Sequence, residues 1–473
     1  MAGGASPLPR LDGMSRSLRR AEERRRALVE GPIVRTMLTF SIPSMIQVGT
    51  QALTNIVEGY FVGRIGVEAL AGVSLVFPLI VLMQTLAGGA FAGAVSSSIG
   101  RAYGAGRRSD AEALVVHAVL IALGIGVLST LLVLYFGPVL YWELGGRGVT
   151  LRSALTYSNI VFCASPLLWL ANIMNGITRA TGNMIVPALA TVASSVVLVV
   201  LSPCLIFGLG PFPQLGIAGA GIAVTVYYLL SVIIVGVFLV SGSSEIRLRL
   251  SGIPIRWTYS TDMLRVGAVS ALVPIQNGFS ALVITGLIGT FGTVVLAGYG
   301  IAARLEFLIM RIMWSLGSTI IAMVAISIGA GQIRRARRVA WLAATVGMVL
   351  TGTIGATATA VPEGWIGLFS HDTSVLAAGA RYLGVVGPFY CFIGLGTSLF
   401  FVSQGADKMM WPSIGNLFRL VVSVSGGWGV VVVLGRDQEA LYVVVAASMA
   451  LYGFVSACGI LRPANGFAVR SCD

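Results

Sequence analysis

The chain has 473 residues, of which 56% are hydrophobic and only 10% are charged, and its formal net charge is +13. Soluble domains contain about a quarter charged residues, and the deficit here extends along nearly the whole chain. This composition excludes a soluble protein with a single anchor and predicts a polytopic membrane protein whose main partner is the lipid bilayer. The 60 glycines fit that class, because small residues let transmembrane helices approach closely.

The basic residues lie in alternate connections between apolar segments, which indicates membrane topology and not a nucleic-acid-binding patch. The five cysteines form no CxxC pair, and the two histidines, His117 and His371, are far apart in the sequence. Neither spacing suits a disulfide framework or a metal centre. We therefore expect no nucleic-acid partner, no metal site and no resident cofactor.

The predicted elements begin with a polar, arginine-rich segment, residues 1–36, which contains "SRSLRRAEERRR". No small-residue cleavage site separates this segment from an apolar core, so we predict a cytoplasmic tail and not a signal peptide. A membrane-spanning helix needs about 20 mostly apolar residues. Segmentation on that length predicts an all-α protein with twelve spans, at residues 37–62, 71–98, 111–137, 155–177, 185–208, 216–240, 263–289, 296–328, 339–361, 376–402, 411–434 and 441–461.

The longest inner connection, residues 241–262, divides these spans into two lobes of six helices, at residues 37–240 and 263–461. Residues 462–473 are then a second cytoplasmic tail. With the N-terminus inside, the tails and the even-numbered connections hold 22 of the 31 lysines and arginines. This asymmetry supports the predicted layout, with both termini in the cytoplasm of a multi-pass plasma-membrane protein.

The two predicted lobes repeat each other in sequence. "MLTFSIPSMIQ" at residue 37 matches "MLRVGAVSALVPIQ" at 263, and "IGVEALAG" at 65 matches "FGTVVLAG" at 291, both with the same offset. Two GAG tripeptides, which begin at Gly104 and Gly329, follow that offset to within one position. Six spans per copy return the chain to the same side, so pseudo-two-fold symmetry about the membrane normal is expected, with a cavity between the lobes.

Several of these segments resemble the multidrug and toxic compound extrusion (MATE) family. The likeness is carried by "IPSMIQVGTQALTNIVEGYFVGRIGVEALAGVSLVFPL", "IGRAYGAGRRSDAEA", "NGITRATGN" and "FGLGPFPQLGIAGAGIAVT", and it extends over nearly all of residues 32–460. It implies two six-helix lobes in a V shape and no enzyme activity. It also implies alternating access and the export of amphipathic, often cationic compounds in exchange for H⁺ or Na⁺.

Glu58, in the first predicted span, is the candidate for ion coupling. Embedded ionisable groups are costly and usually line cavities, and burial favours the neutral carboxylic acid. A glutamate that alternates between environments could bind a proton outside and release it inside. Family members usually carry an aspartate here and an Asn/Asp pair in helix 5, where this chain has Leu198 and Ser202. An interfacial glutamate that reaches the outer surface is the alternative.

Glu306 is the second acidic residue inside a predicted span. Arg304 and Arg311 are two and five residues away, so neither lies on the same helix face, and we expect its partner on another helix. A buried structural ion pair and a role in substrate binding or coupling are both open. Arg304 is a further candidate for the cavity lining.

Six other polar residues are candidates for lining the cavity. Gln51 and Asn55 share a helix stripe with Glu58, and Asn172 and Asn175 share a face of the fourth span. Interhelical hydrogen bonding or simple packing is the alternative for each. The set is Gln51, Asn55, Asn172, Asn175, Thr225 and Gln276.

Competing functions are judged by the side chains that they need. A lipid-modifying membrane enzyme would need a cluster of His, Asp, Glu or Ser residues that two lone histidines do not supply. Within the wider transporter group, a flippase for lipid-linked or polyprenyl-type substrates is the runner-up, favoured by the arginines within spans. We expect a monomer that carries small organic substrates.

Overall fold

The computed structural model describes residues 23–24, 26–241, 244–246 and 257–461, and every secondary-structure element within them is a helix. The C-terminal tail 462–473 and parts of the predicted N-terminal tail and inter-lobe connection lie outside these residues. The helices of the first half are α2 (Ile33–Gly63), α3 (Val67–Thr85), the π-helical η1 (Leu86–Phe91), α4 (Ala92–Gly104), α5 (Arg108–Glu143), α6 (Gly148–Cys163), α7 (Ser165–Ala180), α8 (Ile185–Phe207) and α9 (Ile217–Val240).

The second half follows the same plan. α10 begins at Trp257, inside the segment predicted as the inter-lobe connection, and α2 begins at Ile33 rather than at residue 37. The helices of this half are α10 (Trp257–Gly289), α11 (Thr293–Gly329), α12 (Ile333–Ala360), α13 (Pro362–Ile366), α14 (Thr373–Val386), the 3-10 helix η2 (Gly387–Phe389), α15 (Tyr390–Gly405), α16 (Met410–Val421), the π-helical η3 (Val422–Gly426) and η4 (Gly429–Val433), and α17 (Gln438–Leu461).

These helices make up the predicted spans. In the described part of the chain, ten helical runs are long and apolar enough to cross a membrane, and the pair α6–α7, bent by 49°, is an eleventh. Pro166 stands in the first turn of α7, where its missing N–H prevents the helix from continuing straight. The twelfth is α2, 31 residues long, which carries polar side chains from Gln47 to Glu58.

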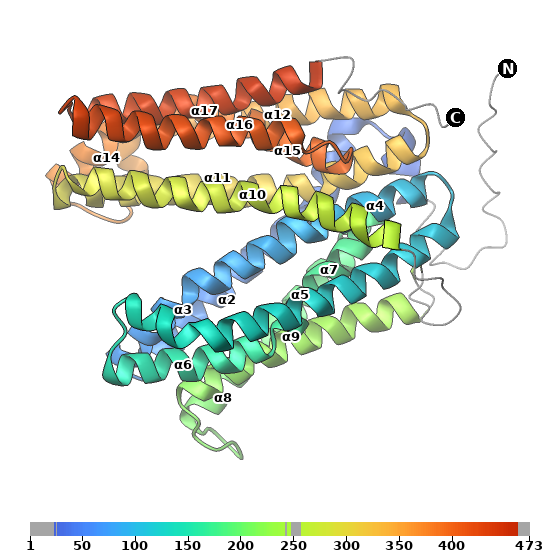
Figure 1. Ribbon diagram of the computed structural model, residues 1–473, viewed down its shortest axis with the longest axis horizontal. Coiled ribbons are helices and arrows are strands. Elements are labelled where there is room, and N and C mark those ends of the chain that lie inside the picture. The colour runs from blue at the N-terminus through green and yellow to red at the C-terminus, as the bar shows by residue number, and fades with distance from the viewer. Residues whose placement is uncertain (1–22, 25, 242–243, 247–256, 462–473) are drawn as a thin grey trace.

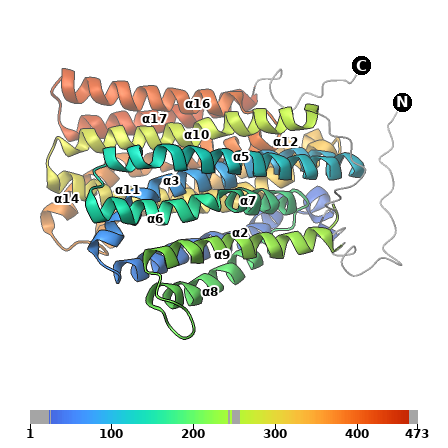
Figure 2. The same cartoon turned by 60° about the horizontal axis from the view of Figure 1, so that its bottom comes forward.

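The two halves form separate bundles that diverge from one end of the molecule (Figure 1). Helices α2 to α9 make one arm and α10 to α17 make the other (Figure 1). In the turned view α16 and α17 lie at one edge of the molecule and α8 and α9 at the opposite edge (Figure 2). The arms meet at the end where α2 begins and α17 finishes. This is the V-shaped, all-α arrangement of two six-helix lobes that the sequence predicts.

The pseudo-two-fold axis passes between α4 and α11, where the lobes meet. A Cβ atom on Gly104 would lie 2.3 Å from the carbonyl oxygen of Ile326, and one on Gly329 would lie 2.1 Å from that of Arg101. These two contacts are equivalent under the pseudo-two-fold symmetry. Gly329 corresponds to Gly104 and Ile326 corresponds to Arg101, both with the offset of the GAG tripeptides. Only glycine permits this approach, so the repeated tripeptides fix how closely the lobes pack.

Candidate ion-coupling and substrate sites

Glu58 lies inside the first lobe. Its Oε1 accepts a hydrogen bond from the hydroxyl of Tyr157, on α6, at 2.6 Å. Tyr157 is only 3% exposed, and Glu58 itself is half-buried. Tyr228 of α9, which accepts a 2.9 Å hydrogen bond from Gln84 of α3, is near enough to interact electrostatically with the carboxylate. The carboxyl group is therefore directed toward α6 and α9.

A column of polar side chains lines the same side of α2 within the first lobe. Arg179 of α7 donates a hydrogen bond of 2.8 Å to Gln47, which in turn donates one of 3.0 Å to Thr191 of α8. Tyr227 of α9 is within hydrogen-bonding reach of both Thr191 and Gln51. Polar groups thus follow one another along α2 from Gln47 toward Glu58.

The remaining first-lobe candidates are dispersed. Asn172 donates a hydrogen bond to the carbonyl of Leu168 in its own helix, and its Oδ1 lies 2.8 Å from where a Cβ on Gly88 would be. Asn175 is buried, and its Oδ1 has no protein partner within the described residues. Thr225 bonds to the carbonyl of Gly221, one turn earlier in α9.

Leu198 and Ser202 of α8, which stand where MATE family members usually carry the Asn/Asp pair, are both buried. Leu198 is 2% exposed and Ser202 is completely buried. The hydroxyl of Ser202 has no partner among the described residues. The hydrogen-bonding neighbour that the structure gives Glu58 is therefore the phenol of Tyr157.

Glu306 has a matching environment in the second lobe. It accepts hydrogen bonds from Tyr382 of α14 at 2.7 Å and from Tyr390 of α15 at 3.3 Å. These partners lie on other helices, as its spacing from the neighbouring arginines predicts. Tyr157 and Tyr382 are separated along the chain by the same number of residues as the two GAG tripeptides, so they occupy equivalent positions in the two lobes. The carboxylates that they bind are not equivalent, because Glu58 belongs to α2 and Glu306 to α11.

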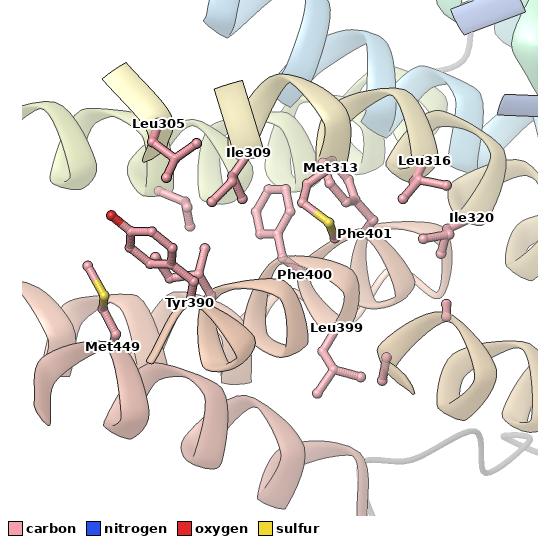
Figure 3. Close-up of a cluster of buried hydrophobic side chains, with 14 of the residues drawn as sticks. Leu305, Ile309, Met313, Leu316, Ile320, Tyr390, Leu399, Phe400, Phe401 and Met449 are labelled. Atoms are coloured by element: carbon pink, nitrogen blue, oxygen red, sulfur yellow. The ribbon is translucent and has the colours of Figure 1, made fainter. Parts of the chain in front are cut away.

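Arg304 and Arg311 point away from Glu306, on the face of α11 opposite its core contacts. That core face carries Leu305, Ile309 and Met313, which pack toward α15 (Figure 3). Both arginines are exposed, and the guanidinium of Arg304 lies 4.9 Å from the ring centroid of Phe369. Arg311 lies at the midpoint of α11. A charged side chain at mid-membrane depth costs about 2.5–3.5 kcal/mol on insertion scales unless it faces water or protein.

Gln276, the other second-lobe candidate, is bound within its own lobe. It accepts a hydrogen bond of 2.8 Å from Asn416 of α16. The structure therefore separates the predicted residues into three groups. Glu306 and Gln276 lie in the second lobe, and Arg304 lies on the face of α11 opposite its core contacts. The first lobe holds the others: Gln51, Asn55, Glu58, Asn172, Asn175 and Thr225.

Polar contacts between the lobes gather where the two arms meet. Gln404, fully buried at the end of α15, donates hydrogen bonds to the carbonyls of Gly89 and Ala90 at 3.1 and 3.0 Å. Those carbonyls are available because η1 is π-helical, and Gly93 leaves room for the glutamine side chain. Nearby, Arg101 of α4 forms an ion pair with Asp407 at 3.2 Å.

Asp407 departs from ordinary backbone geometry. Its φ of 62° is the one positive value at a non-glycine residue in the described part of the chain, and the equivalent position of the first lobe is Gly182, with a φ of 80°. The left-handed conformation costs a non-glycine residue about 1–2 kcal/mol, which is consistent with a structural role for its carboxylate. Burial raises the pKa of Asp407, while the charge of Arg101 opposes that rise.

Several of these residues escaped sequence reasoning: Tyr157, Tyr382, Tyr390, Gln404 and the pair Arg101–Asp407. A signal for the first two existed, because their separation equals that of the two GAG tripeptides. Gln404 and Asp407 carried no such signal, since their partners Gly89 and Arg101 lie 315 and 306 residues away in the chain. Among the described residues, no group of three or more His, Cys, Asp or Glu side chains could hold a metal ion.

Membership of a transporter family follows from comparison with known proteins. The MatE family model matches residues 43–204 and 271–428, and the chain belongs to this family. It is therefore a multi-pass membrane transporter of the drug-export type, and not an enzyme.

Named relatives span almost the whole chain. A FAD transporter of Shewanella oneidensis is 27% identical over 84% of this chain and 88% of its own length. The probable multidrug resistance protein YoeA of Bacillus subtilis is 24% identical, over 84% and 85% respectively. A crystal structure of MATE in the bent conformation, 21% identical, superposes with a TM-score of 0.84 over 94% of this chain and 96% of that one.

Proposed function

We propose that the protein is an H⁺- or Na⁺-coupled antiporter that exports amphipathic organic compounds by alternating access. The observation that carries this proposal is the position of Glu58, enclosed within the first lobe on a polar column with Tyr157 as its hydrogen-bond donor. The carboxyl group takes up the coupling ion from the outer side. It releases that ion inward after the lobes rearrange.

The orientation rests on the distribution of arginines in the sequence. With both termini in the cytoplasm of a plasma-membrane protein, the end at which the arms meet is the inner end. The arms then diverge toward the outside, which corresponds to an outward-open state. Transport of one substrate requires the contacts of Gln404 and Arg101 to break and the outer ends to approach.

The substrates are small organic compounds, and the protein works as a monomer with the transported ion in place of a cofactor. Cationic amphiphiles are the class that the family resemblance implies. A second candidate, a flippase for lipid-linked substrates, is favoured by Arg304 and Arg311. The FAD transporter among its relatives similarly suggests a substrate that carries negative charge.

Transport in proteoliposomes tests the coupling. Wild-type protein and Glu58→Gln are compared for dye accumulation driven by an imposed pH or Na⁺ gradient. Glutamine keeps the hydrogen bond from Tyr157 but cannot exchange a proton, so we expect accumulation to be lost while the melting temperature is unchanged. Undiminished gradient-driven accumulation in Glu58→Gln would remove this residue from the mechanism.

A further inference from the structure

The face of α11 opposite the second-lobe core carries Arg304, Phe307 and Arg311. These residues follow one another at steps of three and four, which places them on one stripe of the helix. The core residues of α11 occupy the other side (Figure 3). Phe307 is 68% exposed, so this stripe is not covered by other side chains. We call these three residues the arginine face.

The arginine face lies on the side of α11 that meets the first lobe. Continued toward the inner end, the same stripe reaches Trp314 and Ser318. The ring of Trp314 lies 1.9 Å from where a Cβ on Gly89 would be, and the Ser318 hydroxyl is 3.0 Å from that of Ser44 on α2. Both contacts cross between the lobes. Arg311 lies one turn from Trp314 in the direction of Thr293, where α11 begins, and toward that end α11 and α2 diverge (Figure 1).

The α2 stripe that begins at Ser44 lies opposite this face, and it carries Gln51, Asn55 and then Glu58, whose carboxyl group accepts a hydrogen bond from Tyr157 inside the first lobe. Gln51 is two helical turns from Ser44 and Arg311 is two turns from Ser318, so both lie about 10 Å from the contact between the two serines. Asn55 follows one turn later on the α2 stripe that begins at Ser44. None of the ion pairs within the described ranges includes Arg304 or Arg311. The space between the lobes therefore carries two positive charges with no acidic group paired to them.

We propose that the arginine face binds an amphipathic organic anion, a phosphate or diphosphate ester that also carries a ring system. This inference rests on the proposed export function and specifies its substrate class. Guanidinium groups bind phosphate oxygens in bidentate fashion, and two of them about 10 Å apart suit an extended anion. Phe307, exposed between them, offers a surface for a ring. Cationic compounds are repelled by the same charges.

This chemistry has two sources, a soluble dinucleotide and a lipid-linked diphosphate. FAD is the probe for the first, because it joins a diphosphate to aromatic rings, and riboflavin, which lacks phosphate, is its neutral control. Vesicles that contain a polyprenyl diphosphate are the probe for the second. Competition between these vesicles and FAD assigns the site to the shared diphosphate group, and binding of FAD without competition assigns it to soluble compounds.

Equilibrium dialysis of the full-length protein reconstituted into lipid nanodiscs measures the binding. We expect FAD to bind at least tenfold more tightly than riboflavin, and Arg311→Gln to weaken FAD binding tenfold or more. Arg304→Gln is a second variant with the same expected direction. Arg436→Gln is the matched control, because it removes the same charge from an exposed outer loop and leaves the interlobe space unchanged.

Three results would overturn the proposal: equal binding of FAD and riboflavin, equal losses in Arg311→Gln and Arg436→Gln, or no saturable binding of either diphosphate. Melting temperatures of the variants separate misfolding from loss of the site. The assay uses no ion gradient, so its failure is distinct from a failure of coupling. A protein that binds no anion but still accumulates dye through Glu58 would refute the substrate class alone.

Discussion

Replacement of Gln404 by leucine should release the inner contact between the lobes. The side chain is fully buried, and the two hydrogens of its Nε2 are shared among three acceptors: the carbonyls of Gly89 and Ala90 in the other lobe and the hydroxyl of Ser270 in its own. Leucine has a similar size but donates nothing. The two η1 carbonyls would then lose this donor while they remain buried between the closed lobes.

The expected magnitude follows from those two interlobe bonds. A buried hydrogen bond contributes about 0.5–1.5 kcal/mol net, and an unsatisfied buried acceptor costs about 1–3 kcal/mol. Loss of both should therefore destabilise the inner-closed arrangement by about 2–3 kcal/mol relative to the inner-open one. Since about 1.4 kcal/mol is a factor of ten, the population ratio should shift roughly 30- to 140-fold.

Electron–electron distance measurement checks this shift. Spin labels at Arg107→Cys and Arg337→Cys, both exposed near the inner ends of α5 and α12, report the separation of the lobes in a cysteine-free background. Gln276→Leu is the matched control, because Gln276 bonds to Asn416 within its own lobe. A distance distribution for Gln404→Leu that equals those of wild type and Gln276→Leu would refute the proposed role of the interlobe bonds.

Two further predictions concern Glu306 and Asp407. Glu306→Gln should retain gradient-driven accumulation and lose only a few degrees of melting temperature, because the amide oxygen still accepts a hydrogen bond from Tyr382. Glu306→Leu should be destabilised by about 1–3 kcal/mol, because the tyrosine loses its acceptor. Loss of coupling in Glu306→Gln would contradict this structural role. Partial burial raises the pKa of Asp407, although its side chain is still 37% exposed. The charge of Arg101 opposes that rise, the charge of Asp262 adds to it, and the charge of Arg265 opposes it. The closed form thus binds the proton more tightly than an open, solvated one. Lowering the inner pH toward the ordinary carboxylate range of about 4 should favour closure. Spin-label distances in a Glu58→Gln background test this, and an identical pH response in Asp407→Asn would count against it.

Composition and periodicity were sufficient for the architecture. Apolar length predicted the spans, and the constant offset between repeated segments predicted the two lobes. These are properties of single helices and of the repeat, so they are readable along the chain. The orientation read from the arginine distribution stays a prediction. The bend at Ser165–Pro166 and the start of α10 at Trp257 departed from the predicted limits, because helix ends depend on local capping and on neighbours.

The sequence alone also singled out Glu58 and Glu306, because a charge inside a spanning helix is conspicuous whatever surrounds it. Only the tertiary structure decided what each carboxylate contacts, since Tyr157 and Tyr382 come from helices 99 and 76 residues away in the chain. It likewise placed Arg311 on the interlobe side of α11 and Gln404 in the slot beside Gly93. The physical reason is that a helix pattern fixes which residues share a face, whereas the packing of distant helices fixes what that face meets.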